Sequence, residues 1–263
     1  MDQVKKHLIN TFFKKIYGKS PEIKSVNPSH DGAKGDWLHL QFGQSKDNAN
    51  EADFLGYECK NHTTSKTTWG DWTANYYIYQ DLKYQSNRDE FLLAFGSPNP
   101  EKNNRISWSG KVCGKYHNQM RASGQLLYVD EHKDISIFYD YEYDQREYKS
   151  DVVPTKFRDR NLLIAKWIGY KTNNHYKKTS LEEKVNKKFN QKGFFKCLME
   201  NGVYSKIVFG EPINFDNWIS HVKDRYIYFD SGMYEGNDRP YSNWRSDNKF
   251  WDILCDEEYS KNA

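Results

Sequence analysis

The sequence has no apolar run long enough to cross a membrane. Nowhere in its 263 residues does a segment approach the roughly 18 consecutive apolar residues that a transmembrane helix needs. Residues 1–6 lead into an amphipathic segment rather than into the apolar core of a signal peptide. We therefore expect a soluble, cytoplasmic protein that does not contact a membrane.

Cysteine is scarce, and its four copies lie more than 50 residues apart, at Cys59, Cys113, Cys197 and Cys255. No pair has the close spacing of a zinc knuckle or of a redox motif. The sequence therefore favours free thiols.

A strong excess of charge of one sign is also absent. Lys and Arg together number 39 against 36 Asp and Glu, a formal net charge of +3 that permits a polyanionic partner without demanding one. Lysine is nevertheless concentrated in one segment, in which the cluster is either the solvated face of a helix or a contact to phosphates. The cluster comprises Lys171, Lys177, Lys178, Lys184, Lys187, Lys188, Lys192 and Lys196.

Aromatic residues are abundant, with 8 Trp, 20 Tyr and 15 Phe, so we expect an ordered protein whose core consists largely of rings. Apolar spacing predicts a helix over Val4–Tyr17, which ends at Gly18, while residues 29–43 suit a helix and a strand about equally. A capping box at Ser180 and Glu183 predicts a helix that runs toward Asn201-Gly202. Asp53–Cys59 suits an extended chain that is interrupted at Gly56. Short apolar runs also predict strands at Tyr76–Tyr79, Phe91–Phe95, Leu126–Val129, Ile135–Tyr139 and Leu162–Ile168.

These elements predict an α/β fold, with a mixed sheet and flanking helices of the α+β kind. We find neither an internal repeat nor a low-complexity linker. Residues 1–263 should therefore form a single domain with two lobes.

One segment contains the pattern Asp53-x4-Glu58-x-Lys60. On a strand Glu58 and Lys60 project from one face, and a bend at Gly56 can bring Asp53 beside them. Two carboxylates, water and a phosphate oxygen form the oxygen-rich shell that Mg²⁺ prefers. A lysine there would orient the attacking water and offset charge in the transition state of phosphodiester hydrolysis.

The pattern alone leaves alternatives open, because an acidic residue two positions before a lysine recurs along the chain. The strongest rival is Glu147-Tyr148-Lys149 with Asp140 or Asp144 upstream, although residues 139–149 offer almost no aliphatic side chain to anchor a buried strand. The other interpretation of the Glu58 segment is an exposed hairpin.

The wider pattern Gly35-x3-His39-x13-Asp53-x4-Glu58-x-Lys60-x-His62 resembles the catalytic stretch of the MvaI and BcnI type II restriction endonucleases. These are relatives of the mismatch-repair nickase MutH within the PD-(D/E)xK nuclease superfamily. A second stretch, Arg225-x5-Ser231-Gly232-x3-Gly236, resembles the segment with which MvaI-like enzymes meet base edges. The two matches occur in the order that the family has.

The resemblance implies a PD-(D/E)xK core in a two-lobed clamp, with the catalytic motif within residues 30–70. Asp53, Glu58 and Lys60 would be catalytic, the first two as ligands of Mg²⁺. Mn²⁺ would substitute for Mg²⁺, and Ca²⁺ would support DNA binding without cleavage. The family usually carries a glutamate where this chain has His39, so His39 is either an active-site neighbour or a helix residue packed near Trp37.

The resemblance also implies a DNA-recognition segment at residues 224–250. Arginine can pair with guanine, asparagine with adenine, and an acidic group with cytosine. His62 and Lys66 could reach the phosphate backbone, or could belong to an exposed polar turn. The expected DNA-binding residues are His62, Lys66, Arg225, Asp230, Arg239, Tyr241, Asn243 and Arg245.

The function implied is Mg²⁺-dependent, sequence-specific cleavage of double-stranded DNA by a prokaryotic enzyme that acts as a monomer and has a companion DNA methyltransferase. A MutH-like nickase is the nearest alternative. Alternatives of another class are a DNA-binding protein without catalysis and a carbohydrate-binding module, against which the basic clusters count.

Overall fold

A computed structural model describes residues 2–22, 32–44, 49–171 and 179–261, which form two compact units. Unit 1 comprises Met1–Thr67, Lys184–Asn214 and Asp247–Ala263, and unit 2 comprises Thr68–Glu183 and Phe215–Ser246. Positions 30, 31 and 45–48 of the expected catalytic stretch lie outside the described residues, as do Lys177 and Lys178. Among the described helices, none is both long and apolar enough to span a bilayer.

Unit 1 is built on a four-stranded sheet with the order β1-β9-β10-β13. β1 is parallel to β9, whereas the β9–β10 and β10–β13 pairs are antiparallel. Its strands are β1 (Glu58–Asn61), β9 (Phe194–Glu200), β10 (Val203–Gly210) and β13 (Cys255–Ser260). Its helices are α1 (Gln3–Thr11), the π-helix η1 (Phe12–Ile16), α2 (Ala33–Phe42) and α7 (Asn248–Ile253), and α5 (Leu181–Phe189) enters it from unit 2.

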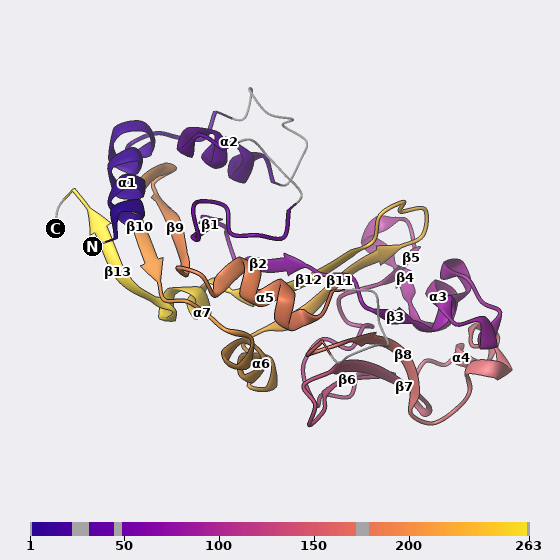
Figure 1. Ribbon diagram of the computed structural model, residues 1–263. Helices are drawn as coiled ribbons and strands as arrows, with labels where there is room; N and C mark the ends of the chain where they lie inside the picture. The colour runs from indigo at the N-terminus through magenta and orange to yellow at the C-terminus, as the bar shows by residue number, and fades with distance from the viewer. Residues whose placement is uncertain (1, 23–31, 45–48, 172–178, 262–263) are drawn as a thin grey trace. The chain divides into compact units, whose positions relative to one another are not determined.

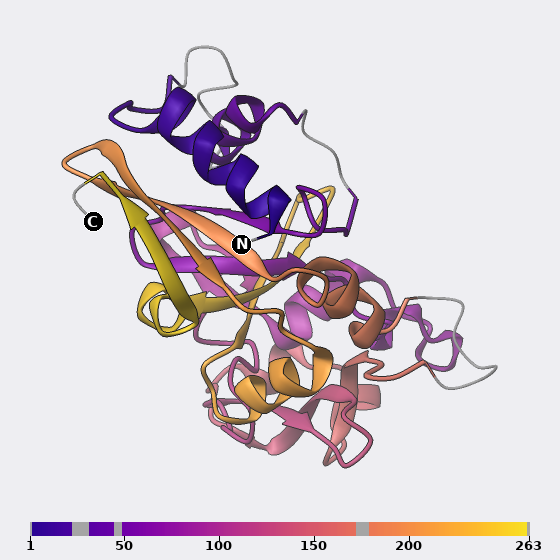
Figure 2. The ribbon, with the colours of Figure 1, turned by 60° about the vertical axis from the view of Figure 1, so that its left-hand side comes forward.

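The helices α1 and α2 pack on one face of this sheet (Figures 1 and 2). Phe12 and Trp37 are buried there, and the Trp37 ring stacks on Tyr204 of β10 at 5.7 Å. The helix expected before Gly18 is present as α1 and η1, and within the described part of residues 29–43 the chain forms the helix α2. The opposite face of β1 is therefore the one that carries the polar side chains Glu58 and Lys60.

The capping box at the start of α5 is confirmed, because the Ser180 Oγ accepts from the Glu183 N–H at 3.2 Å and the Glu183 carboxylate accepts from the Ser180 N–H at 2.9 Å. The expected end of this helix is wrong. α5 ends at Phe189, and Asn201 and Gly202 form the turn between β9 and β10 with φ of 51° and 82°. An Asn-Gly pair readily adopts positive φ and so also suits a two-residue hairpin turn.

Unit 2 contains a five-stranded sheet with the order β2-β12-β11-β5-β4 and a four-stranded sheet with the order β3-β8-β7-β6. The first sheet consists of β2 (Lys66–Asp71), β12 (Tyr241–Asp247), β11 (Tyr228–Tyr234), β5 (Arg105–Trp108) and β4 (Ser97–Asn99). The second consists of β3 (Tyr76–Tyr77), β8 (Leu162–Trp167), β7 (Ile135–Asp144) and β6 (Ser123–Val129). The helices are α3 (Arg88–Phe95), α4 (Lys149–Val152) and α6 (Phe215–Lys223), with short 3₁₀ turns at Ile78–Gln80, Leu82–Tyr84, Pro100–Lys102 and Thr155–Phe157.

Rings dominate both cores, as the composition predicts. All eight tryptophans are buried, and in unit 2 the Trp244 ring lies 5.5 Å from Trp167 and 5.3 Å from Trp218. The four cysteines are free thiols. The strand expected at Phe91–Phe95 is wrong: these residues end α3, whose first turn is capped by Asn87, since its Oδ1 accepts from the Glu90 N–H.

Candidate active site

A tight turn before β1 brings Asp53 back beside the strand. Phe54 and Tyr57 exchange two backbone hydrogen bonds of 2.9 and 3.0 Å, and Leu55 and Gly56 between them have φ of 46° and 100°. The Asp53 Oδ2 then accepts from the N–H of Cys59 at 2.8 Å. The bend expected at Gly56 is present, and it places the Asp53 carboxylate against the backbone that carries Glu58.

Glu58 and Lys60 project from the same face of β1 and are in contact, with 2.8 Å between the Lys60 Nζ and the Glu58 Oε1. A second ammonium group meets the same oxygen, because the Lys188 Nζ of α5 lies 3.1 Å from it. The exposed side-chain fractions are 3% for Glu58, 11% for Lys60 and 17% for Lys188. One buried carboxylate therefore holds two lysines through a single oxygen.

At this centre burial and the neighbouring opposite charges shift the pKa values in opposite directions. Burial raises the pKa of Glu58, the two lysines oppose that shift, and the nearby Asp53 charge reinforces it. Burial also lowers the pKa of Lys60, which lies 5.4 Å from the Phe189 ring and 5.9 Å from the Trp251 ring. Perturbed groups of this kind, grouped on one strand, are typical of an active site.

The other oxygen of Glu58 is free to accept a ligand. The Glu58 Oε2 is buried and has no hydrogen-bond partner among the described residues, an arrangement that costs free energy unless a ligand meets the oxygen. Within the described part of the chain, no three His, Cys, Asp or Glu side chains are grouped to hold a metal ion. Two carboxylates still fit a hard divalent cation, which usually keeps water and substrate oxygens in its remaining positions.

The segment of α5 in unit 1 forms the platform of this centre. The Lys184 carbonyl accepts from the Asn50 side chain at 2.9 Å, and the Lys187 carbonyl accepts from the Ala52 N–H at 3.3 Å. After the helix, the Gly193 carbonyl accepts from the Glu58 N–H at 3.0 Å. These bonds fix the turn before β1, and β1 itself, relative to α5.

Lys188 is a site residue that the sequence pattern did not single out. The sequence allows two interpretations of the lysine cluster, a solvated helix face and a contact to phosphates. Neither of them includes a contact with Glu58. A signal was present, since Val185 and Phe189 are buried and Lys188 follows Val185 by three positions on the same side of the helix. Lys187 instead lies outward, with 60% of its side chain exposed.

His39 belongs to the same neighbourhood. It lies on α2 with its Nε2 3.8 Å from the Asp53 Oδ2, and its ring meets Phe54 edge to face at 5.8 Å. Burial lowers its pKa, which favours a neutral imidazole. His39 thus stands beside Asp53, where it can orient that carboxylate.

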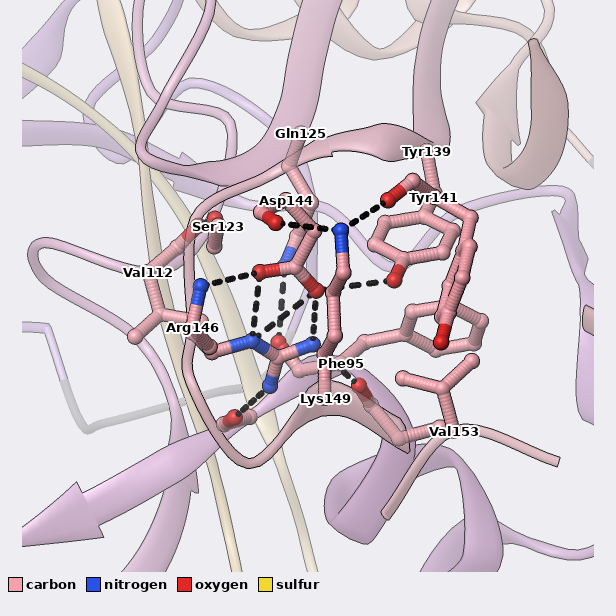
Figure 3. A network of polar contacts seen from close by, with 12 residues as sticks. Phe95, Val112, Ser123, Gln125, Tyr139, Tyr141, Asp144, Arg146, Lys149 and Val153 are labelled. Atoms are coloured by element: carbon pink, nitrogen blue, oxygen red, sulfur yellow. Dashed lines mark hydrogen bonds and ion pairs between the residues drawn. The ribbon is translucent and has the colours of Figure 1, made fainter. Parts of the chain in front are cut away.

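The rival pattern around Lys149 is a structural network in unit 2 (Figure 3). The Asp144 carboxylate is fully buried and accepts from Arg146 and from the Tyr139 hydroxyl. Lys149 donates to the Tyr141 and Asp144 carbonyls at 2.8 and 2.7 Å. Because the partners of Lys149 are backbone carbonyls, this network does not reproduce a carboxylate–lysine catalytic pair.

Most of the predicted recognition residues share one face of the β11–β12 hairpin. Asp230 pairs across the strands with Asn243, and Gly232 pairs with Tyr241. Arg245 is on the same face, with its guanidinium 3.2 Å from the Asp230 carboxylate. The alternate residues, such as Phe229 and Trp244, are buried, so the pleat separates a polar face from the core.

The remaining predicted DNA-binding residues lie outside the polar face of this hairpin. Arg225 precedes β11 and donates to the His117 and Asn118 carbonyls at 3.0 and 3.1 Å. Arg239 is 72% exposed in the turn after β11. In unit 1, Lys66 begins β2, and His62 lines a cavity of about 480 Å³ together with the buried Lys196.

Comparisons with known proteins identify a family and a relative by sequence, and a solved structure by fold. The family model described as LlaMI restriction endonuclease matches residues 16–259. The chain is 42% identical to the type II restriction enzyme ScrFI of Lactococcus lactis subsp. cremoris, over 97% of this chain and 98% of that protein. Its fold matches the MvaI restriction endonuclease in complex with its cognate DNA substrate, with a TM-score of 0.60, 11% identity and 99% coverage of both chains. The expected restriction-endonuclease-like fold is thereby confirmed.

Proposed function

The chain belongs to the LlaMI restriction endonuclease family, and on that premise we propose that Asp53, Glu58 and Lys60 are its active centre and that Mg²⁺ is its metal. Membership makes the protein a type II restriction endonuclease, a site-specific deoxyribonuclease that acts on DNA and uses a divalent metal. The resemblance drawn from the sequence patterns is confirmed at the level of the family.

The observation that carries the proposal is the state of the Glu58 carboxylate. Its Oε1 is bound by lysine, its Oε2 is buried without a partner among the described residues, and the Asp53 carboxylate lies close by. A hard cation would satisfy the free oxygen, whereas the Asp144 network offers no such atom. We therefore assign the metal to Asp53 and Glu58.

The residues of β1 supply separate parts of the chemistry. When bound, Mg²⁺ would polarise a phosphate oxygen and offset negative charge as the phosphodiester bond breaks. Lys60, held at Glu58 by its 2.8 Å contact, can donate a hydrogen bond to the attacking water or to the phosphate. Asp53 and Glu58 would hold the metal, and so keep the scissile phosphate within reach of that lysine.

The polar face of the β11–β12 hairpin supports a role in reading base edges. A two-stranded ribbon fits the major groove of B-DNA, and this one presents Asp230, Asn243 and Arg245 together with Tyr241. Arg239 lies in the connecting turn. His62 and Lys66 remain our candidates for contacts with the phosphate backbone, and Arg225 for a DNA contact beyond the hairpin.

Digestion of a sequenced plasmid tests this function. The purified protein alone, with Mg²⁺, should produce discrete linear fragments whose ends map to one short sequence, and EDTA should abolish them. Nicked circles without linear product would instead indicate a MutH-like nickase. Intact plasmid that is bound at a specific site would indicate a DNA-binding protein without catalysis.

We also propose that the enzyme acts as a monomer with a companion DNA methyltransferase, as the resemblance implies. A first-order dependence of the cleavage rate on enzyme concentration, and the mass of the Ca²⁺ complex on a single-site duplex, test the monomer. A methyltransferase gene beside the coding sequence, whose product protects the mapped site, tests the companion.

A further inference from the structure

We propose that Lys188 is a second active-site lysine, a positioning residue that holds Glu58 through the Oε1 and adds positive charge where the scissile phosphate binds. The proposal rests on the function proposed above. Lys188 comes from α5, 128 positions after Lys60 in sequence, and no part of the Asp53-x4-Glu58-x-Lys60 pattern includes it. Its contact with Glu58 is 3.1 Å long.

The geometry argues against an ordinary structural ion pair. Lys60 already provides Glu58 with a counter-ion, so a second ammonium group is not needed to neutralise the buried carboxylate. Here both ammonium groups meet the Oε1 and leave the Oε2 without a described partner. Lys188 therefore helps to keep the carboxylate in the one orientation that presents a free oxygen.

The position of Lys188 is fixed by the protein. The α5 carbonyls of Lys184 and Lys187 accept hydrogen bonds from the segment that precedes Asp53, so the helix is tied to the turn that carries this carboxylate. The side chain is 17% exposed, which leaves it accessible to a substrate, in contrast to a lysine sealed in the core. A second ammonium group placed this way favours an arriving phosphodiester.

The net charge of the centre predicts the direction in which its affinities for metal and for phosphate change when Lys188 is replaced. Asp53, Glu58, Lys60 and Lys188 together balance, so removal of the Lys188 charge leaves the centre more negative. A more negative centre attracts a divalent cation more strongly and a phosphate more weakly. In a variant without the Lys188 charge, Lys60 still contacts the Oε1 of Glu58, so the carboxylate keeps its place; removal of a lysine that the fold requires would instead lower thermal stability and metal affinity together.

The test compares Lys188→Met with Lys188→Arg, and uses Lys187→Met as the matched control from the exposed side of the same helix. Single-turnover cleavage of a cognate duplex in saturating Mg²⁺ should fall about 10-fold or more in Lys188→Met, as expected on loss of a preorganised charge, and stay within about twofold of the parent in Lys187→Met. Lys188→Arg keeps the charge and should recover most of the rate. Calorimetric titration of the DNA-free protein with Ca²⁺ should give an affinity for Lys188→Met that equals or exceeds the parent's.

Two results would overturn the proposal. One is a Lys188→Met rate within about twofold of the parent, the margin set for the control. The other is a joint loss of Ca²⁺ affinity and of thermal stability that Lys188→Arg does not restore, which would indicate a structural role. Failure of the parent protein to cut DNA would contradict the proposed function instead, so the two failures are distinguishable.

Discussion

At the scale of single residues, the turn that carries Asp53 back to β1 depends on Gly56. Its φ of 100° is unfavourable for any residue with a Cβ, and a Cβ built there would lie 3.0 Å from the Cγ of Lys192. Gly18 offers a matched control, because it also has a positive φ, of 74°, but a Cβ there would meet nothing within 4 Å. Comparison of alanine variants at the two positions therefore distinguishes the cost of a positive φ from the added cost of a steric clash.

We expect Gly18→Ala to lower the free energy of unfolding by about 1–2 kcal/mol and Gly56→Ala to lower it by more. Only Gly56→Ala should also slow cleavage, by about 10-fold or more, since its turn positions Asp53. Urea denaturation and single-turnover cleavage measure the two effects. Equal losses of stability, with cleavage intact in both variants, would show that this turn does not position the site.

We expect the Asp144–Arg146 pair to serve stability rather than catalysis. Its side chains are 0% and 9% exposed, and Arg146 also donates to the Ala94 and Gly96 carbonyls at the end of α3. Removal of one member leaves a buried charge without its partner, so Arg146→Ala should cost about 3–5 kcal/mol. Glu147→Ala, at an exposed position next to it, should change the free energy of unfolding by less than about 0.5 kcal/mol. Equal effects in a denaturation experiment would refute the structural assignment of this network.

At the scale of elements, the β11–β12 hairpin should separate recognition from chemistry. Asn243→Ala should lose about 1–3 kcal/mol of discrimination at one base pair and bind Ca²⁺ like the parent. Arg225→Ala should weaken binding to all sequences alike, because the guanidinium of Arg225 lies outside the polar face. Binding to the cognate duplex and to its single-base variants in Ca²⁺ measures both. Unchanged discrimination by Asn243→Ala would remove that residue from base readout.

Local sequence patterns predicted correctly those elements for which the pattern suits a single kind of structure. The amphipathic spacing before Gly18, the capping box at Ser180 and the bend at Gly56 all appear as expected. The apolar run Phe91–Phe95 has no visible period, so a buried helix could not be told from a strand without the Asn87 cap. Asn201-Gly202 suits a helix end and a hairpin turn equally, and the sheet decides between them.

The candidate site was predictable where its residues are neighbours in sequence. Asp53, Glu58 and Lys60 lie on one turn and one strand, and the resemblance singled them out from several similar patterns. Lys188 reaches Glu58 only because β9, which follows α5, pairs with β1 in parallel. Such a contact depends on the order of strands in a sheet, which periodicity does not encode.

At the scale of the whole molecule, metal binding should stabilise the folded protein. A ligand that binds only the native state adds about 2.7 kcal/mol at a concentration 100 times its Kd. Mg²⁺ should therefore raise the Tm of the parent and of Glu147→Gln, and raise that of Glu58→Gln much less. Thermal scans in Mg²⁺ and in EDTA make the comparison, and an equal shift in all three proteins would place the metal elsewhere.

The central claim is that the carboxylate of Glu58 serves the cleavage reaction. The most direct measurement is the single-turnover rate of cleavage of a cognate duplex by Glu58→Gln and by Glu147→Gln, each compared with the parent in saturating Mg²⁺. We predict a loss on the order of 10²-fold or more for Glu58→Gln, because the neutral amide would no longer hold the metal that offsets charge at the phosphate, and a parental rate for Glu147→Gln. Normal cleavage by Glu58→Gln together with an inactive Glu147→Gln would contradict the account and move the active centre to unit 2.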